Sequence, residues 1–310
     1  MTKRTEQQPT LTGKDVLRSI VGVETSVPPD GFTASILGTE RSGSGVVIGE
    51  KGLVLTIGYL ITEAEQVSLT TASGRVVEGH PLAYDQETGF GLIQALGPLD
   101  APAIAFGDSA EVRTGDDVFF ASAGEVVEAQ LAAKQEFAGY WEYLLDEALF
   151  TAPAHPSWGG GALIGADGRL LGVGSLMLQA ATQEGTQDIN MVVPINLLPP
   201  ILDELVTRGR VDRPARPWLG LYSTDNDGHV VAMNVDPRGP AAAAGMQAGD
   251  IIRDVRDRSI DDLGDFYRAV WASGPAGTEI PLRIVRDGRE QWIRIKSADR
   301  DDFLKKPVLQ

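Results

Sequence analysis

Residues 155–178 read HPSWGGGALIGADGRLLGVGSLML, and this stretch carries more structural information than any other in the chain. Two apolar segments flank Asp167-Gly168, a pair that favours a tight turn between strands. Three consecutive glycines, Gly159 to Gly161, precede them. Glycines in series mark backbone that lies close to another surface or adopts conformations that a Cβ forbids. The stretch therefore predicts a strand pair preceded by a closely packed loop.

Strand-like segments extend from this stretch back to about Phe32. They are short, they are rich in β-branched residues or alternate between apolar and polar residues, and glycine turns separate them. One example is VSLTTASGRVVEGH, which indicates a hairpin at Ser73-Gly74. Many short strands at such spacing are typical of an antiparallel sandwich or barrel. A helix is expected only later, where Leu198, Ile201, Leu202 and Leu205 have helical spacing and Gly209 offers a stop.

Residues 209–216 contain Pro214 and are followed by Pro217, a pattern that indicates a linker. Beyond it, HVVAMNV and IIRDVRD predict strands, and SIDDLGDFYRAVWAS predicts a helix capped by Asp261 or Asp262. A final hairpin is expected on Asp287-Gly288. The region is thus a compact α+β module of about 80 residues, a size within the usual range for a domain, followed by a charged tail.

Composition excludes several kinds of partner. The chain has 27 basic and 43 acidic residues and a formal charge of −16, which opposes affinity for nucleic acid or anionic lipid. It has no cysteine, and its acidic pairs are explained by caps and tails, so we expect no metal site and no cofactor. The first residues lack a signal-peptide apolar run, and no segment approaches the ~20 apolar residues of a membrane span. We expect a cytoplasmic protein.

The last module resembles a PDZ domain of the type that follows the protease domain in HtrA/Deg proteins. The segments RPWLGL and VDPRGPAAAAGMQAGDII supply that family's aromatic-Leu-Gly loop, its small-residue helix and its Gly-Asp-Ile-Ile turn. Met246 stands where the family has leucine. The preceding residues are similar to the chymotrypsin-like domain of the same family, through GSGVVI, GLVLTIGYLI, YDQETGFGLIQ, PSWGGGALIGADGRLLGV and NMVVPIN.

This resemblance implies a mainly β protein, in which a chymotrypsin-like double antiparallel β-barrel is followed by an α+β PDZ domain. The implied organisation is an N-terminal extension (1–30), an inactive protease domain (31–208), a linker (209–216), a PDZ domain (217–298) and a tail (299–310).

Placed by these motifs, the three triad positions are occupied by residues that cannot perform the family's chemistry. Tyr59 stands at the histidine position, Gly89 at the aspartate position and Gly159 at the nucleophilic serine position. Acyl transfer needs a hydroxyl nucleophile and a base that accepts its proton near neutral pH. Glycine has no side chain to attack with, and an ordinary tyrosine has a pKa near ~10. We therefore expect no catalytic residue.

Ser157, which lies close to His155, is the position at which the sequence offers a displaced nucleophile. Neighbouring loop side chains rarely aim at each other, so local hydrogen bonding is the favoured interpretation of both residues. Ser157 also stands where the family has an oxyanion-hole glycine, which indicates a different loop conformation. His80 and His229 are expected at the surface.

The resemblance also implies a peptide-binding site in the PDZ domain. Backbone amides would hold the carboxylate of a peptide C-terminus that is added as a strand. The alternative is that the WLGL segment is simply a core strand. The resemblance implies three roles at this site: backbone amides that hold the carboxylate, a nearby positive charge, and a pocket for the terminal side chain. The amides are those of Leu219, Gly220 and Leu221, the charge is that of Arg216, and the pocket is lined by Leu219, Leu221, Phe266, Ala269 and Val270.

Three functions remain open at this stage. The first is a non-catalytic HtrA-like scaffold or adaptor that binds peptides or the C-termini of unfolded proteins. The second is a serine endopeptidase with an unrecognised nucleophile. The third is an oligomeric regulator, either a homo-oligomer such as a trimer or a co-assembly with an active homologue.

Overall fold

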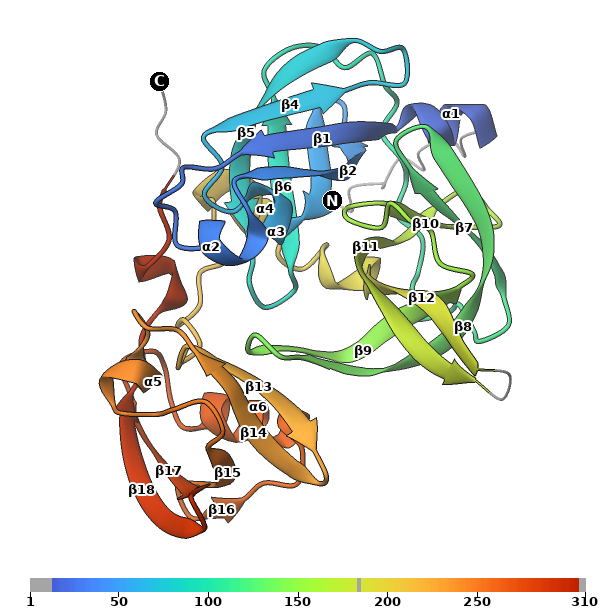
Figure 1. The fold of residues 1–310 in the computed structure, drawn as a ribbon. Coiled ribbons are helices and arrows are strands. Elements are labelled where there is room, and N and C mark those ends of the chain that lie inside the picture. The colour runs from blue at the N-terminus through green and yellow to red at the C-terminus, as the bar shows by residue number, and fades with distance from the viewer. Residues whose placement is uncertain (1–12, 183–184, 307–310) are drawn as a thin grey trace, which may run out of the picture. The chain divides into compact units, whose positions relative to one another are not determined.

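The computed structural model describes residues 13–182 and 185–306. The chain divides into two compact units, each of which is discontinuous in sequence (Figure 1). The barrel unit holds the residues up to Gln135, then Glu147–Val211 and the chain from Lys305 onward. The sheet unit holds Glu136–Asp146 and Asp212–Leu304.

The first barrel of the barrel unit is a closed antiparallel sheet in the order β1-β2-β3-β6-β5-β4. Its closure comes from the pairing of β1 with β4. The hairpin expected at Ser73-Gly74 joins β4 to β5. The strands are β1 (Ile20–Ser26), β2 (Glu40–Gly49), β3 (Leu53–Ile57), β4 (Gln66–Thr70), β5 (Val76–Tyr84) and β6 (Phe90–Ala95), and the short helices beside them are α1 (Gly13–Arg18), α2 (Ala34–Leu37) and α3 (Gly58–Ile61).

The second barrel closes in the order β10-β11-β12-β9-β8-β7. Asp167-Gly168 forms the expected turn between β10 and β11, and Gly168 has a left-handed φ of 77°. The strands are β7 (Asp117–Ser122), β8 (Glu125–Gly139), β9 (Tyr143–Ala152), β10 (Ala162–Gly165), β11 (Leu170–Thr182) and β12 (Gly185–Pro194). The two closed barrels confirm the predicted double-barrel fold.

The helix after the second barrel is shorter than the helical spacing predicts. A 3₁₀ turn η1 (Ile195–Leu197) comes first, and α4 (Leu202–Arg208) begins only after Pro199-Pro200. Proline has no amide hydrogen to donate to a preceding turn and its ring clashes with it, which explains the late start. The helix ends as expected at Gly209, whose φ is 71°.

The sheet unit is an antiparallel sheet in the order β13-β14-β15-β17-β18, with β16 paired to β15. Asp262, not Asp261, caps α6: its carboxylate accepts the amide hydrogen of Asp265 at 2.7 Å. Pro240 opens α5, as its fixed φ favours. The elements are β13 (Leu221–Asn226), β14 (His229–Val235), α5 (Pro240–Ala243), β15 (Ile251–Val255), β16 (Arg258–Ser259), α6 (Leu263–Ala272), β17 (Glu279–Arg286), β18 (Arg289–Lys296) and η2 (Arg300–Asp302).

Two structural features differ from the expected domain boundaries. The expected extension 1–30 contains β1, whose apolar residues Ile20, Val21 and Val23 are buried in the first barrel. Its residues 1–12 lie outside the described residues. The expected tail 299–310 contains η2, and the ring of Phe303 lies 4.9 Å from that of Trp218. Aromatic packing therefore orders the start of the tail; residues 307–310 lie outside the described residues.

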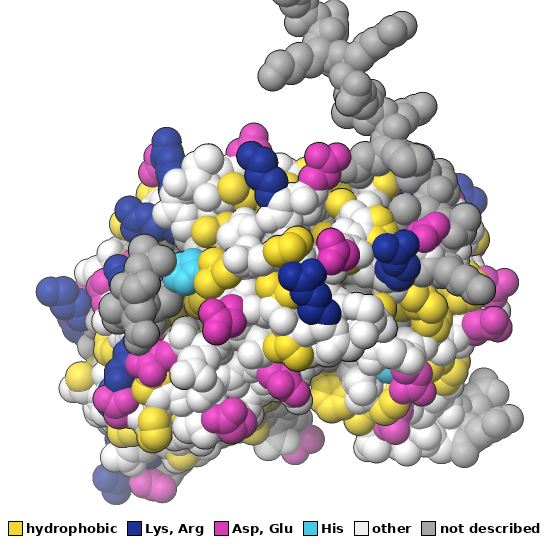
Figure 2. All heavy atoms as spheres, turned by 90° about the horizontal axis from the view of Figure 1, so that it is seen from above, with side chains coloured by type: hydrophobic (Ala, Val, Ile, Leu, Met, Phe, Trp, Pro, Cys, Tyr) yellow, Lys and Arg dark blue, Asp and Glu magenta, His cyan; other side chains and the backbone are white. Residues whose placement is uncertain are grey.

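Charge on the surface is mixed. On the face shown in Figure 2, Asp and Glu side chains lie among Lys and Arg side chains. Within residues 13–182 and 185–306, we find no helix with the length and apolar character that crossing a bilayer requires.

Candidate functional site

Tyr59, at the histidine position, lies at the start of α3, where the chain leaves β3. Its hydroxyl donates a hydrogen bond of 2.9 Å to the backbone carbonyl of Ser175 on β11. Burial raises the pKa of the Tyr59 phenol well above its ordinary value of 10. The group therefore stays neutral near pH 7, with its proton held by a backbone acceptor, and is unsuited to the role of a general base.

The atoms that surround Gly159, Gly160 and Gly161 explain why this loop has three consecutive glycines. A Cβ at Gly159 would lie 2.7 Å from the Tyr59 hydroxyl oxygen. A Cβ at Gly160 would lie 1.9 Å from the Ser44 carbonyl oxygen, and a Cβ at Gly161 would lie 2.4 Å from the Phe120 ring. Only hydrogen fits at these positions, because backbone and aromatic groups already fill the space.

Gly89, at the aspartate position, contributes only backbone to this region. Its carbonyl accepts the Gly58 amide at 2.7 Å, and its own amide donates to the Asp85 carbonyl at 2.8 Å. The carboxylate of Asp85 is buried and accepts both the amide and the hydroxyl of Thr88, at 3.0 and 2.8 Å. That carboxylate therefore stabilises its own turn.

His155 and Ser157 are arranged for local hydrogen bonding. The amide of Ser157 donates to Nδ1 of His155 at 3.0 Å, so Nδ1 is the acceptor and Nε2 carries the proton of the neutral ring. Nε2 lies 3.2 Å from the hydroxyl of Ser122. His155 is fully buried, and burial lowers the pKa of its imidazole. Both ring nitrogens are thus engaged, and the Ser157 amide points at a histidine.

The other two histidines are half-buried, although they were expected at the surface. His80 lies on β5 and His229 on β14. The Nδ1 atom of His229 lies 2.9 Å from a guanidinium nitrogen of Arg253.

The sheet unit brings three consecutive amides onto one carboxylate. The amides of Gly220 and Leu221 donate to Oε1 of Glu142 at 2.7 and 3.0 Å, and the amide of Leu219 donates to Oε2 at 3.0 Å. Gly220 has a φ of 79°, a left-handed conformation that glycine adopts without strain. This backbone loop, residues 219–221, is a built carboxylate-binding nest, which we call the carboxylate loop.

Glu142 was not among the residues expected at this site. It lies in the turn between β8 and β9, far from the loop in sequence, and only 5% of its surface is exposed. The sequence places an aromatic pair, Tyr140-Trp141, directly before it, and two large aromatic side chains in a turn were the available signal.

Arg216, expected to add positive charge at the carboxylate loop, lies with its guanidinium carbon 4.3 Å from the centre of the Trp271 ring. This is a cation–π contact, which the sequence did not predict. Arg300 on η2 is the cation whose charge acts on the Glu142 carboxyl group.

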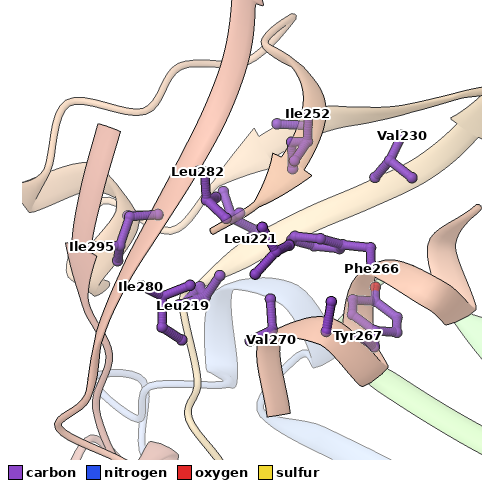
Figure 3. Packing of buried hydrophobic residues seen from close by; sticks show 14 of the residues in the cluster. Leu219, Leu221, Val230, Ile252, Phe266, Tyr267, Val270, Ile280, Leu282 and Ile295 are labelled. Carbon is purple, nitrogen blue, oxygen red and sulfur yellow. The ribbon is translucent and has the colours of Figure 1, made fainter. Parts of the chain in front are cut away.

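The side chains expected to line the peptide pocket do lie together. Figure 3 shows Phe266 and Val270 on α6 beside Leu219 and Leu221. All of them belong to one buried hydrophobic cluster, as the interpretation of the WLGL segment as a core strand predicts. The expected pocket residues in this cluster, each less than a tenth exposed, are Leu219, Leu221, Phe266, Ala269 and Val270.

Comparison with known proteins agrees with both folds. The family model of the trypsin-like peptidase domain matches residues 43–173, and that of the PDZ domain matches residues 217–296. The chain therefore carries a region similar to a trypsin-like peptidase domain, followed by a region similar to a PDZ domain.

Two curated relatives illustrate the similarity. Serine protease Do-like HtrA of Bacillus subtilis is 23% identical over 295 residues, which cover 84% of this chain and 64% of the relative. Periplasmic serine endoprotease DegP of Escherichia coli is 27% identical over 272 residues, which cover 82% of this chain and 56% of the relative. The chain thus spans between half and two thirds of the length of these relatives.

Solved structures share the fold along most of the chain. HtrA-type protease AlgW with tripeptide has a TM-score of 0.55 at 20% identity and covers 96% of this chain and 99% of that one. The serine endoprotease from Yersinia pestis has a TM-score of 0.54 at 24% identity and covers 94% and 99%. At these identities the likeness shows the fold alone.

The expected cytoplasmic location is contradicted by the relatives. DegP of Escherichia coli and the DegP-like protein of Halomonas elongata are named as periplasmic endoproteases. The expectation rested on the apolar content of the first residues, and residues 1–12 lie outside the described residues. The barrels and the sheet themselves do not determine a compartment.

Proposed function

We propose that this chain is a non-catalytic HtrA-like scaffold or adaptor whose sheet unit binds peptide C-termini or extended segments. The observation that carries the proposal is the convergence of three amides, from Leu219, Gly220 and Leu221, on a single carboxylate. Amide hydrogen bonds to a charged acceptor are among the stronger hydrogen bonds in proteins. A loop that binds one carboxylate in this way fits the terminal carboxylate of a peptide equally well.

The absence of catalysis is proposed from the triad positions. Residue 159 has no side chain, and the space that a serine Cβ would need is taken by the hydroxyl of Tyr59. In subtilisin, loss of the nucleophile or of the histidine base costs about 10⁶ in turnover. His155, the buried histidine nearest in sequence to residue 159, has both ring nitrogens engaged.

A serine endopeptidase is the second candidate. The comparisons, taken alone, support it better than the scaffold, because the relatives are named as serine proteases or endoproteases. Its nucleophile would have to lie outside the family position, and Ser157 is the residue considered for it.

Two assays on the full chain separate these candidates. With DegP as positive control, we expect no cleavage of fluorescent casein and no labelling by a fluorophosphonate probe. Labelling of Ser157 that disappears in the Ser157→Ala variant would establish the endopeptidase instead. For peptide binding, a library of labelled decapeptides should bind about tenfold more tightly as free acids than as C-terminal amides, because the amides lack the charged acceptor.

Assembly stays a proposal. The homologues support oligomer formation in general, and we infer that this chain forms a homo-oligomer or assembles with an active homologue. Mass photometry of the chain alone, and of the chain mixed with such a homologue, tests this inference. It would be contradicted if this chain had the mass of a monomer when alone and no particle of mixed composition appeared in the mixture.

A further inference from the structure

The tip of the hairpin formed by β8 and β9 belongs to the sheet unit, while the base of the same hairpin belongs to the barrel unit. The tip covers Glu136–Asp146. We call its turn residues, Tyr140-Trp141-Glu142, the tip segment. A carboxylate from within the chain therefore reaches the carboxylate loop.

The tip segment contacts β13 as an added strand would. The amide of Ser223 donates to the carbonyl of Tyr140 at 2.9 Å, two residues before Glu142. β13 is the first strand in the sheet order and so forms an edge with amides open to pairing. A peptide bound by strand addition also offers a backbone carbonyl to the edge strand and its carboxylate to a backbone nest. The tip segment thus reproduces both contacts of such a ligand.

Helix α6 holds the hairpin tip from the other side. The hydroxyl of Tyr267 donates to the Gly139 carbonyl at 2.8 Å and accepts the Glu142 amide at 3.2 Å. Arg268 forms ion pairs with Glu136 and Asp146, one on each strand of the hairpin.

Apolar packing adds to these polar contacts. Leu144 is 8% exposed and belongs to the buried cluster of the sheet unit, and Ala138 packs against the same cluster. Burial of apolar side chains stabilises the contact by roughly 25 cal/mol for each Å² removed from water.

We propose that the tip segment is a tethered ligand of the carboxylate loop, and that an external peptide must displace it to bind. The proposal rests on the proposed peptide-binding function and adds its regulation. A tethered competitor acts at the millimolar effective concentrations typical of intramolecular binding. The apparent affinity for a free peptide is then lowered by the fraction of molecules in which the loop is open.

The ionisation of Glu142 gives this contact a pH dependence. Burial, the largest influence, raises the pKa of its carboxyl group from 4.5 to about 7, against the opposing effects of the three amides and of Arg300. Tyr267 on α6 and Tyr222 on β13 also face it, and burial raises the pKa of both phenols, so they stay neutral. Because the docked pKa is raised, docking is favoured by protonation: it is strongest below pH 4.5 and weakens as pH rises through 7.

Raising the pH from 5.5 to 8 is expected to weaken docking of the tip segment by roughly tenfold or more. The Gly220 amide reports this directly, since it donates to the titrating oxygen. In ¹⁵N-correlated NMR spectra of the full chain, its shift should titrate with a midpoint near 7, as the Glu142 carboxyl group does. The titration should vanish in the Glu142→Gln variant; a midpoint unchanged by that substitution would assign it to another group.

The proposal itself is tested by competition on the full chain. The probe is a fluorescein-labelled heptapeptide that copies residues 136–141 and ends in a valine with a free carboxylate. Glu142→Ala removes the side-chain carboxyl group that accepts the three amides, so the probe should bind about tenfold or more tightly than to the unmodified chain. The matched control is Glu290→Ala, at an exposed glutamate of β18 in the same unit, which should leave the affinity unchanged.

A second variant keeps the test valid if substitution of Glu142 impairs folding. Tyr267→Phe keeps the buried ring and removes only the hydroxyl that holds Gly139 and Glu142, so it should tighten probe binding several-fold without altering the thermal unfolding temperature by more than a few degrees. Equal affinities in the unmodified chain and both variants overturn the tethered ligand and leave peptide binding intact. No binding of the probe or of the decapeptide library in any variant overturns peptide binding as well.

Discussion

Replacing Gly160 with alanine is expected to destabilise the barrel unit by more than about 3 kcal/mol. The Cβ would lie 1.9 Å from the Ser44 carbonyl oxygen and 2.5 Å from the Thr56 hydroxyl. Ser44 is held in β2 by its pairing with β1, so its carbonyl has little room to move. The φ of Gly160 is 74°, which adds backbone strain to the steric conflict. Differential scanning calorimetry of the full chain measures the loss as a lower unfolding temperature of one transition.

Gly74 provides the matched control because it separates strain from crowding. Its φ is 81°, similar to that of Gly160, but a Cβ there would meet nothing within 4 Å. Gly74→Ala should therefore cost only about 1 kcal/mol, the backbone contribution alone. Equal losses in the two variants would show that the packing around Gly160 is not what requires glycine.

Gly159→Ser is expected to cost about 2 kcal/mol, even though serine is the residue that a catalytic family member carries there. The serine Cβ would lie 2.7 Å from the Tyr59 hydroxyl oxygen, and the next nearest atom of that ring is 3.7 Å away. The conflict is thus with one oxygen. Tyr59→Phe removes that oxygen, at a cost of about 1 kcal/mol for the hydrogen bond to the Ser175 carbonyl.

A double-mutant cycle tests this conflict. The double variant should be more stable than the sum of the two single losses predicts, by about 1 to 2 kcal/mol, because phenylalanine makes room for the serine. Strict additivity of the unfolding free energies, measured by urea denaturation of the barrel unit's transition, would contradict the contact between residues 59 and 159.

Most of the fold follows from local sequence patterns. The hairpins predicted at Ser73-Gly74, Asp167-Gly168 and Asp287-Gly288 are present, and the glycine of each pair adopts a left-handed φ, the conformation that such turns require. The start of α4 was predicted less well, since Pro199-Pro200 outweighs the helical spacing of the leucines around it.

The carboxylate loop was predictable because its three residues are adjacent in sequence. Its occupant was not, because Glu142 and Gly220 lie 78 residues apart and no periodicity links them. The positions of two cations also depend on the tertiary structure: Arg216 lies over the Trp271 ring, and the charge of Arg300 acts on Glu142. Contacts of this kind depend on which turns the topology brings to one sheet edge.

The discontinuous sheet unit has a practical consequence for experiments on fragments. Four backbone junctions connect it to the rest of the chain, after residues 135, 146, 211 and 304. A recombinant fragment cut at the limits of the matched PDZ region, 217–296, would omit Glu142 along with the whole hairpin. Such a fragment would offer its amides to any added carboxylate, and screening hits obtained with it would overstate what the intact polypeptide captures.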